Sequence, residues 1–286
     1  MKTGLVLEGG AMRGMFSAGV IDVFLEEGLV FDAAVGVSAG ATFGCNIKSG
    51  QAGRTVRYNK RFAKDPRFGS FRSLLSTGDY YNVDFCYRRI PEELDPFDNR
   101  AFAENPMKFY VVATDAASGK PVYVRMTDCG EKDLQWIRAS ASMPLFSRPV
   151  EIDGRKFMDG GIADSIPLRF MEHRGYERNV CVLTRPLGYR KKDSSLQPVV
   201  DRMMRDYPAL AEAMKKRPAR YNHTLDYIKE REEAGAAFVI RPPEKLPVSR
   251  LEHDPEKLEE AYQMGVREAR KRLPELRLFL GEAKAV

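Results

Sequence analysis

The amino-acid sequence predicts an α/β fold whose central sheet is mainly parallel. Residues 5–8 form a short apolar strand that ends at Gly9-Gly10, and the amphipathic stretch 15–27 is typical of a helix closed by Gly28. Residues 31–37 form a second predicted strand, which runs through Gly36-Val37-Ser38-Ala39-Gly40 into small residues that suit a tightly packed helix. Two successive strand–turn–helix units predict parallel strands joined by helical crossovers.

The overall composition is that of a folded protein with a sizeable core. The chain has 286 residues, 43% of them hydrophobic, which is enough for one large domain or a domain with an extension. No apolar run approaches the roughly 20 residues needed to cross a bilayer. Met1-Lys2-Thr3 leads directly into the first strand, which leaves no room for a secretory signal. We therefore expect a soluble, cytoplasmic protein.

Charge and cysteine content argue against several other functions. The four cysteines form no Cys-x-x-Cys pair and have no histidine nearby, so they predict reduced thiols rather than a metal site or a disulfide framework. The 46 basic residues are interspersed with 40 acidic ones, which indicates a mixed, solvated surface. No nucleic-acid-binding module is visible, so no nucleic-acid partner is expected.

The middle of the chain combines an irregular segment with two predicted hairpins. Residues 54–105 are rich in aromatics, arginine and proline without a clean period, which suggests loops and short helices that cap the sheet. Strands are expected over 108–114 and 121–126. Strands over 150–152 and 155–158 flank Asp153-Gly154, a strong hairpin signal, and this hairpin leads to Asp159-Gly160-Gly161.

The α/β alternation continues toward the C-terminus. A strand is expected over 179–184, a helix over 199–217 with a break at Pro208, a further helix over 221–233 and a strand over 236–241. A terminal helix has Asp254 as its N-cap and Pro255 at its first position, and is predicted to end near residue 272, before Pro274.

Ser38 is the candidate nucleophile. A serine in Gly-x-Ser-x-Gly is useful when the glycines permit a sharp turn between strand and helix, because that turn exposes the hydroxyl and directs helix N–H groups toward it. The predicted strand before Ser38 and the small residues after it supply this context. The alternative is that Ser38 only caps the following helix.

The glycine-rich turn from Gly9 to Gly14 is the candidate oxyanion hole. Acyl transfer needs donors for the negative oxygen that forms on the attacked carbonyl, and Gly10 and Ala11 offer unshielded backbone N–H groups at the start of a helix. The alternative is a phosphate-binding loop, although neither Gly-x-Gly-x-x-Gly nor a Gly-Lys-Ser/Thr ending is present. Arg13 could hold the loop or attract an anionic head group.

A base must accept the serine proton, and two kinds are open. None of the three histidines has the setting of a triad member, since His173 lies at a predicted helix end and the other two lie in charge-rich segments. Asp159 follows a strand and precedes two glycines, where a carboxylate can be presented at a sheet edge. A turn aspartate can also serve merely as a local hydrogen-bond acceptor.

Three blocks, taken together and in order, strongly resemble the signatures of the patatin-like phospholipases. They are Gly9-Gly10-Ala11-Met12-Arg13-Gly14, Gly36-Val37-Ser38-Ala39-Gly40 and Asp159-Gly160-Gly161, and the resemblance extends to Ala139-Ser140-Ala141-Ser142-Met143-Pro144. It covers roughly residues 3–185. This chain has Glu8 where the family often has aspartate, and Ala11 where it usually has a third glycine. The methyl group of Ala11 disfavours a positive φ angle.

The resemblance implies a three-layer α/β/α sandwich and a Ser38–Asp159 dyad that hydrolyses fatty-acyl esters of glycerolipids or lysolipids without a metal or cofactor. The resemblance also implies that the residues that form the oxyanion hole or bind substrate are Gly9, Gly10, Ala11, Arg13, Gly14 and Ala39. Phe157, Met158 and Ile162 could supply the apolar surroundings that raise the pKa of the aspartate. Two alternatives stay open: a Ser-His-Asp esterase that uses His173, and a non-catalytic acyl-lipid-binding protein.

Residues 186–286 form a C-terminal α/β extension, ending in helix, that we expect to pack on the catalytic domain of residues 3–185. The last helix carries Arg267, Arg270, Lys271 and Arg272, with apolar residues just beyond. It therefore suggests either contact with an anionic membrane surface or docking onto the protein's own core.

Overall fold

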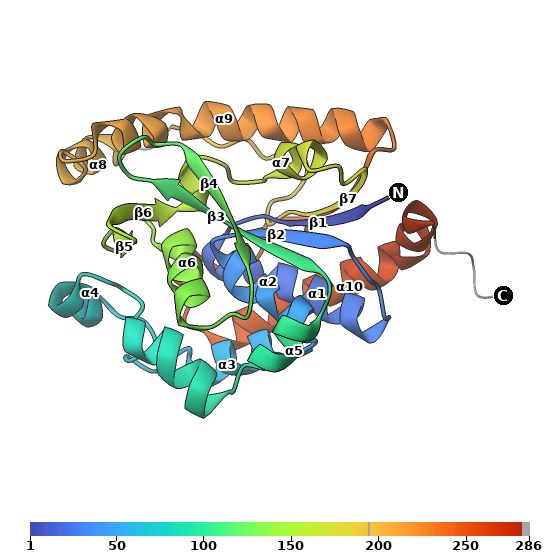
Figure 1. Ribbon diagram of the computed structural model, residues 1–286, viewed down its shortest axis with the longest axis horizontal. Coiled ribbons are helices and arrows are strands. Elements are labelled where there is room, and N and C mark those ends of the chain that lie inside the picture. The colour runs from blue at the N-terminus through green and yellow to red at the C-terminus, as the bar shows by residue number, and fades with distance from the viewer. Residues whose placement is uncertain (194, 282–286) are drawn as a thin grey trace.

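An eight-stranded sheet forms the centre of the computed structural model, which describes residues 1–193 and 195–281 (Figure 1). Its strand order is β5-β6-β3-β2-β1-β7-β8, and β4 pairs with β3. The pairings among β1, β2, β3, β7 and β8 are parallel, whereas β4, β5 and β6 are antiparallel to their neighbours. The strands are β1 Thr3–Leu7, β2 Ala33–Val37, β3 Lys108–Asp115, β4 Pro121–Met126, β5 Val150–Ile152, β6 Arg155–Asp159, β7 Arg178–Val182 and β8 Ala237–Ile240.

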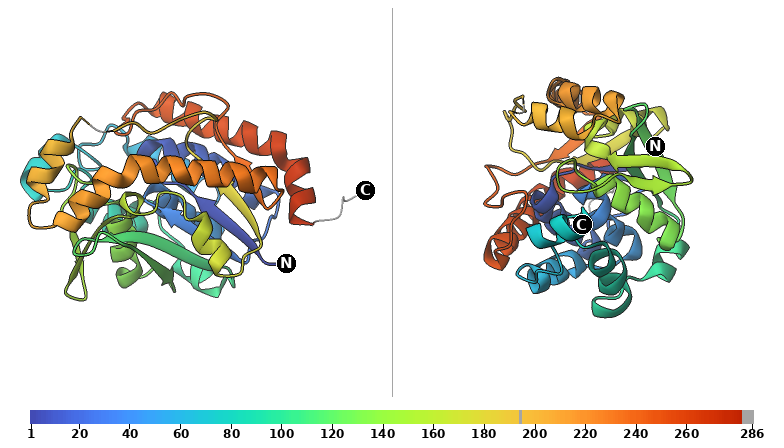
Figure 2. Two further views of the ribbon diagram at one scale, coloured as in Figure 1. Left: turned by 90° about the horizontal axis from the view of Figure 1, so that it is seen from above. Right: turned by 90° about the vertical axis from the view of Figure 1, so that its left-hand side faces the viewer.

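Helices cover both faces of this sheet. Side chains along a strand alternate between its faces, so Leu5 and Leu7 of β1 join one core cluster while Val6 joins another. The first cluster is closed by α1 (Gly14–Glu26), α2 (Ala39–Ser49) and α10 (Pro255–Leu280), and the second by α7 (Leu168–His173) and α9 (Pro208–Glu233). Seen from the side, the sheet lies between α9 and α10 (Figure 2). The predicted three-layer α/β/α sandwich is therefore confirmed.

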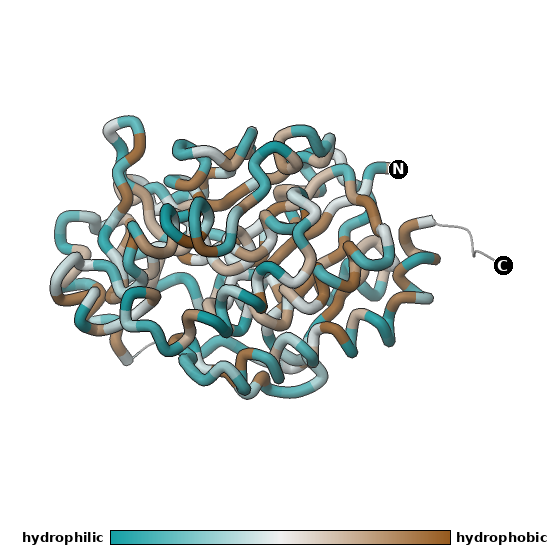
Figure 3. Tube along the Cα trace, turned by 90° about the horizontal axis from the view of Figure 1, so that it is seen from below, coloured by the Kyte–Doolittle hydropathy of each residue, from teal (hydrophilic) through white to brown (hydrophobic). Residues whose placement is uncertain are grey.

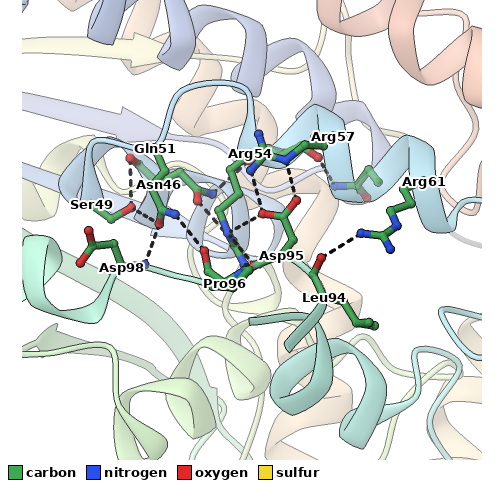
Figure 4. A network of polar contacts seen from close by, with 12 residues as sticks. Asn46, Ser49, Gln51, Arg54, Arg57, Arg61, Leu94, Asp95, Pro96 and Asp98 are labelled. Atoms are coloured by element: carbon green, nitrogen blue, oxygen red, sulfur yellow. Dashed lines mark hydrogen bonds and ion pairs between the residues drawn. The ribbon is translucent and has the colours of Figure 1, made fainter. Parts of the chain in front are cut away.

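The irregular segment after α2 folds into short helices on the side of α2 that faces away from the sheet (Figure 1). They are α3 (Arg54–Phe62), α4 (Phe71–Thr77), the π-helix η2 (Phe85–Leu94) and α5 (Asn99–Glu104), so the predicted short helices are confirmed. A polar network anchors them (Figure 4). In it, Arg57 contacts the Asp95 carboxylate at 2.7 Å and the buried Arg54 donates to the Asp95 backbone carbonyl at 2.7 Å.

The C-terminal region is joined to the rest of the fold by a strand and a helix. Strand β8 extends the sheet by pairing in parallel with β7. Helix α10 crosses α1 so closely that a methyl group on Gly265 would lie 2.0 Å from the Phe16 carbonyl oxygen, and one on Gly19 would lie 2.2 Å from the Tyr262 carbonyl oxygen. Two glycines therefore permit backbone contact between the helices.

Two predicted helix boundaries in this region are wrong. The sequence predicts one helix ending at residue 217 and another starting at 221, yet α9 runs without interruption through Pro218. Likewise α10 continues past Pro274 to Leu280. Proline removes one backbone hydrogen bond from a helix, but burial of Tyr221 and Ile228 in α9 and of Leu276 in α10 holds both helices onto the core. The predicted break at Pro208 is confirmed, since α8 (Gln197–Met203) ends before it and α9 begins at Pro208.

Hydrophilic and hydrophobic residues alternate along the helices on the lower side of the molecule (Figure 3). None of the described helices combines the length and the apolar character needed to cross a membrane.

Candidate active site

Ser38 lies in a sharp turn between β2 and α2. Its backbone has φ 54° and ψ −120°, a sparsely populated region for a residue with a side chain. The flanking glycines are needed for packing: a methyl group on Gly36 would lie 2.3 Å from the Gly40 carbonyl oxygen, and one on Gly40 would lie 2.3 Å from the Leu7 carbonyl oxygen. The Ser38 side chain makes no capping bond to α2, which disfavours a purely structural N-cap role.

The glycine turn packs directly against the Ser38 turn. A methyl group on Gly9 would lie 2.9 Å from the Val37 carbonyl oxygen. Ala11 adopts φ 49°, so its methyl group does not prevent the left-handed conformation. Within the described part of the chain, the backbone N–H groups of Gly10, Ala11 and Ala39 donate to no hydrogen bond. They are therefore available to an oxyanion. Gly14 begins α1 and contacts α2 instead.

Asp159 ends β6, where Ala113 of β3 is its antiparallel partner. The residue is 4% exposed, and its Oδ1 accepts a hydrogen bond from the Gly161 N–H at 2.7 Å. Burial raises the pKa of this carboxyl, as expected from its apolar neighbours. The positive charge of Arg217 and the nearby Ser38 hydroxyl oppose that rise in pKa. The carboxylate thus serves as a local acceptor and also meets Ser38.

The segment before the aspartate hairpin holds both residues in place. It forms the end of α6 (Glu131–Ala141) and the turn that follows. The Ser38 N–H donates to Ser140 Oγ at 2.8 Å, and the Asp159 N–H donates to the Ser142 carbonyl at 2.9 Å. The three residues Ser140–Ser142 therefore tie the two halves of the candidate dyad together, a role that no local pattern predicted for these serines.

A large apolar cavity opens beside Ser38. Its volume is about 1090 Å³, at the upper end of the range for small-molecule sites. Ala11, Ser38 and Ala39 are among the residues that line it. The rest is lined mainly by α2, α6 and the short helices of the cap, with side chains that include Phe43, Tyr58, Phe68, Ile90, Leu134 and Ile137. The segment predicted to cap the sheet thus builds the wall of a lipophilic chamber.

A smaller, polar cavity also has Ser38 in its lining. Ser38, Asp159 and the glycine turn line it, together with Glu8, Arg13, Arg185, Lys191, Arg217, Tyr221 and Arg250. Glu8 accepts hydrogen bonds from the Thr184 N–H and the Tyr221 hydroxyl, both at 2.6 Å. The last four of these lining residues come from the C-terminal region, where no local motif marks them. Only the tertiary structure reveals their place.

The histidines lie elsewhere. None of the described residues that line either cavity at Ser38 is a histidine. His173 ends α7, and His253 contacts the Tyr80 hydroxyl and the Ala63 carbonyl. Among the residues that the structure describes, no group of histidine, cysteine and acidic side chains could hold a metal ion.

Comparison with known proteins identifies two regions of the chain. Residues 5–171 match the model of the patatin-like phospholipase family, and residues 207–281 match a domain of unknown function, DUF6363. YjjU of Escherichia coli strain K12, an uncharacterized protein, is 34% identical over 221 residues, which cover 70% of this chain and 60% of YjjU.

Two more distant relatives are named as an NTE family protein and as lysophospholipase nte1. The NTE family protein Mb1092c of Mycobacterium bovis is 28% identical over 58% of this chain and 44% of that protein. Lysophospholipase nte1 of Aspergillus oryzae is 24% identical over 96% of this chain but 18% of that protein. The chain thus spans 60% or less of these curated relatives. Among solved structures, VipD from Legionella pneumophila aligns with a TM-score of 0.49 and 15% identity, over 96% of this chain and 67% of VipD.

Proposed function

Because this chain belongs to the patatin-like phospholipase family, we propose that it hydrolyses fatty-acyl esters of glycerolipids or lysolipids, with Ser38 as nucleophile and Asp159 as general base. One observation carries the proposal: a backbone-strained Ser38 and a buried Asp159 line the same cavity, and no histidine is among the described residues there. Strained backbone at a buried polar residue is typical of functional sites.

Asp159 would take the proton of the Ser38 hydroxyl as its oxygen attacks the ester carbonyl. A carboxylate is ordinarily a weak base, but burial raises the pKa of Asp159 and so increases its affinity for that proton. Its hydrogen bond with the Gly161 N–H orients the side chain. A raised pKa held in check by Arg217 suits a group that must be ionised before attack and protonated after it.

The tetrahedral intermediate would place its oxyanion among the N–H groups of Gly10, Ala11 and Ala39. These donors are fixed before substrate binds, because the glycine turn and the Ser38 turn pack on each other. Preorganised donors of this kind stabilise developing charge without reorganisation. The ester C–O bond then breaks, and Asp159 returns its proton to the departing alkoxide.

Water would complete the cycle by the same route. Asp159 accepts a proton from the water as its oxygen attacks the acyl-enzyme, and the Ser38 oxygen leaves with that proton as the ester breaks. The acyl chain would occupy the apolar cavity of about 1090 Å³ throughout. Patatin-family membership and the apolar lining both support a fatty-acyl substrate.

Covalent labelling with a fluorophosphonate probe, with the modified residue mapped by mass spectrometry, tests the nucleophile. Hydrolysis of a medium-chain ester is measured in parallel for Ser38→Ala, Asp159→Asn and, as a matched control, His173→Ala. We expect labelling at Ser38, loss of turnover in the first two variants and retention in the third. Loss of turnover in His173→Ala would favour a Ser-His-Asp esterase. A protein that binds lipid but shows neither labelling nor turnover would refute the hydrolase assignment.

A further inference from the structure

Basic side chains gather at the smaller cavity in excess of acidic ones. The described residues that line it include the five cations Arg13, Arg185, Lys191, Arg217 and Arg250, against the two acids Glu8 and Asp159. Four of the five lie beyond residues 5–171, which match the patatin-like family, and three of these, Lys191, Arg217 and Arg250, also lie beyond residue 185. This part of the site is therefore supplied by the C-terminal region.

The two acids are already engaged and do not pair with these cations. Glu8 accepts from the Thr184 N–H and the Tyr221 hydroxyl, and Asp159 accepts from the Gly161 N–H. Within the described chain, none of the five cations forms an ion pair with a carboxylate at 4.0 Å or less. The cavity therefore holds more positive than negative charge, and none of these cations is in direct contact with a carboxylate.

Buried donors at this cavity are also unused. The Nε atoms of Arg13 and Arg217 are buried, and neither has a hydrogen-bond partner. Arg217 also directs its Nη2 toward the aspartate turn, since a methyl group on Gly161 would lie 3.0 Å from it. Burial and repulsion from Arg217 and Arg250 lower the pKa of Lys191 to about 7. Arg250 is exposed, but the buried, unused donors of Arg13 and Arg217 carry a desolvation cost that a bound anion would relieve.

We propose that this cavity binds the phosphate group of a glycerophospholipid or lysophospholipid substrate, with Lys191, Arg217 and Arg250 as its recognition residues. The inference rests on the proposed hydrolase function and adds to it a phosphate-binding site built by residues outside the patatin-like match. Arginine guanidinium groups bind phosphate oxygens in pairs, and lysine adds a point charge. Ser38 lines both cavities, so one ester can reach it with the acyl chain on the apolar side and the phosphate on the basic side.

The short separation between the ester and the phosphate in the substrate fits two cavities that share Ser38 in their lining. In a glycerophospholipid, only the glycerol carbons separate the ester oxygen from the phosphate, so the two groups must occupy adjacent sites. The basic cavity has a volume of about 40 Å³, which suits a small polar group and excludes an acyl chain. A neutral diacylglycerol would leave the cations unpaired, so the site should discriminate against it.

The test compares two micellar substrates that share their ester groups, dioctanoylphosphatidylglycerol and dioctanoylglycerol. The ratio of their kcat/KM values is measured for wild type, Lys191→Gln, Arg250→Gln and the double variant, with Lys192→Gln, an exposed neighbour, as the matched control. Arg217 is left intact because it faces the proposed base. We expect the phospholipid-to-diacylglycerol ratio to fall by about tenfold or more in each single variant, as for a lost charge-assisted bond, and to stay unchanged in the control.

Binding of inorganic phosphate to the Ser38→Ala protein, followed by calorimetry, provides a readout that needs no turnover. Phosphate that binds to this protein but not to its Lys191→Gln counterpart, and that competes with the phospholipid in the active enzyme, supports a head-group site. Lys191-dependent phosphate binding without competition would overturn the head-group assignment, because it would indicate a site for the free anion.

An unchanged substrate ratio, or an equal loss on both substrates, would also overturn the proposal. A protein that hydrolyses neither substrate would refute the proposed function. In that event, phosphate binding that is lost in Lys191→Gln would still support an anion site at this cavity. If the protein binds no phosphate either, the anion site is refuted too. Thermal unfolding of each variant identifies any that fail to fold.

Discussion

Replacing Gly265 by alanine should destabilise the protein, although alanine is the better helix former. The methyl group would lie 2.0 Å from the Phe16 carbonyl oxygen in α1, where ordinary contact begins at 3.4 Å. Helices α1 and α10 would therefore have to separate by more than about 1 Å, because neither backbone can yield locally. Buried residues on both helices, such as Phe16 and Leu258, would lose close packing as a result.

The expected magnitude follows from two opposing effects. Alanine in place of glycine stabilises a helix by up to about 1 kcal/mol, whereas overpacking a core costs about 1–3 kcal/mol and separation of the interface adds to that. We expect a net loss of about 2 kcal/mol in the free energy of unfolding, which corresponds to a fall in Tm of about 4 °C or more. Gly19→Ala should behave similarly, and the double variant should lose less than the sum, since the helices have already parted.

Urea denaturation monitored by circular dichroism measures these changes. Arg267→Ala, at an exposed position of the same helix, serves as the control and should lie within about 0.5 kcal/mol of wild type. A Gly265→Ala protein as stable as wild type would refute the reasoning, since it would mean that the helix crossing tolerates a side chain.

Three further predictions concern charge. Hydrolysis of a neutral ester should decline as pH falls through the raised pKa of Asp159, above its ordinary value of 3.8, because only the ionised carboxylate accepts the serine proton; a rate that stays constant down to pH 4 would contradict this role. Burial raises the pKa of Asp22 from 3.8 to about 6, so the folded state binds this proton more tightly than the unfolded state, and the free energy of unfolding falls as pH rises through that window. The free energy of unfolding of Asp22→Asn, measured by urea denaturation, should therefore exceed that of wild type by about 1–3 kcal/mol at pH 8 and equal it at pH 3. Asp95→Ala should cost about 3 kcal/mol, because it leaves Arg54 buried without its carboxylate, and limited proteolysis should then cut the cap first; an unchanged cleavage pattern would argue against the anchor.

The parts of the fold that could be predicted are those with local causes. Ser38 could be predicted because it stands between Gly36 and Gly40 where an apolar strand meets a helix, and the Asp153-Gly154 turn predicted the hairpin whose second strand carries Asp159. The sequence predicts an interruption of α9 near Pro218 and an end of α10 before Pro274, because proline is unfavourable in a helix. Burial of both helices against the core overrides this local rule. The sequence alone could not show how strongly that face is buried.

The basic side of the candidate site could not be predicted for a different reason. Arg217 and Arg250 lie far from Ser38 along the chain, and each belongs to a segment whose charges resemble an ordinary solvated surface. Their proximity depends on α9 crossing the sheet and on the loop before α10 returning to the glycine turn, where the Met12 N–H meets the Arg250 carbonyl at 3.5 Å. Ala11 adopts a positive φ, although its methyl group was expected to disfavour that conformation.

The pairing of β8 with β7 limits how the gene can be dissected. A fragment that ends at residue 185 would leave β7, all but one of whose residues are buried, as an uncovered edge that invites aggregation. Such a fragment would also lack Tyr221, whose hydroxyl donates to Glu8, and helix α10, which packs on α1. Expression of the two predicted segments as separate modules, or their exchange between relatives, should therefore yield insoluble or inactive material unless both halves of the sheet are supplied together.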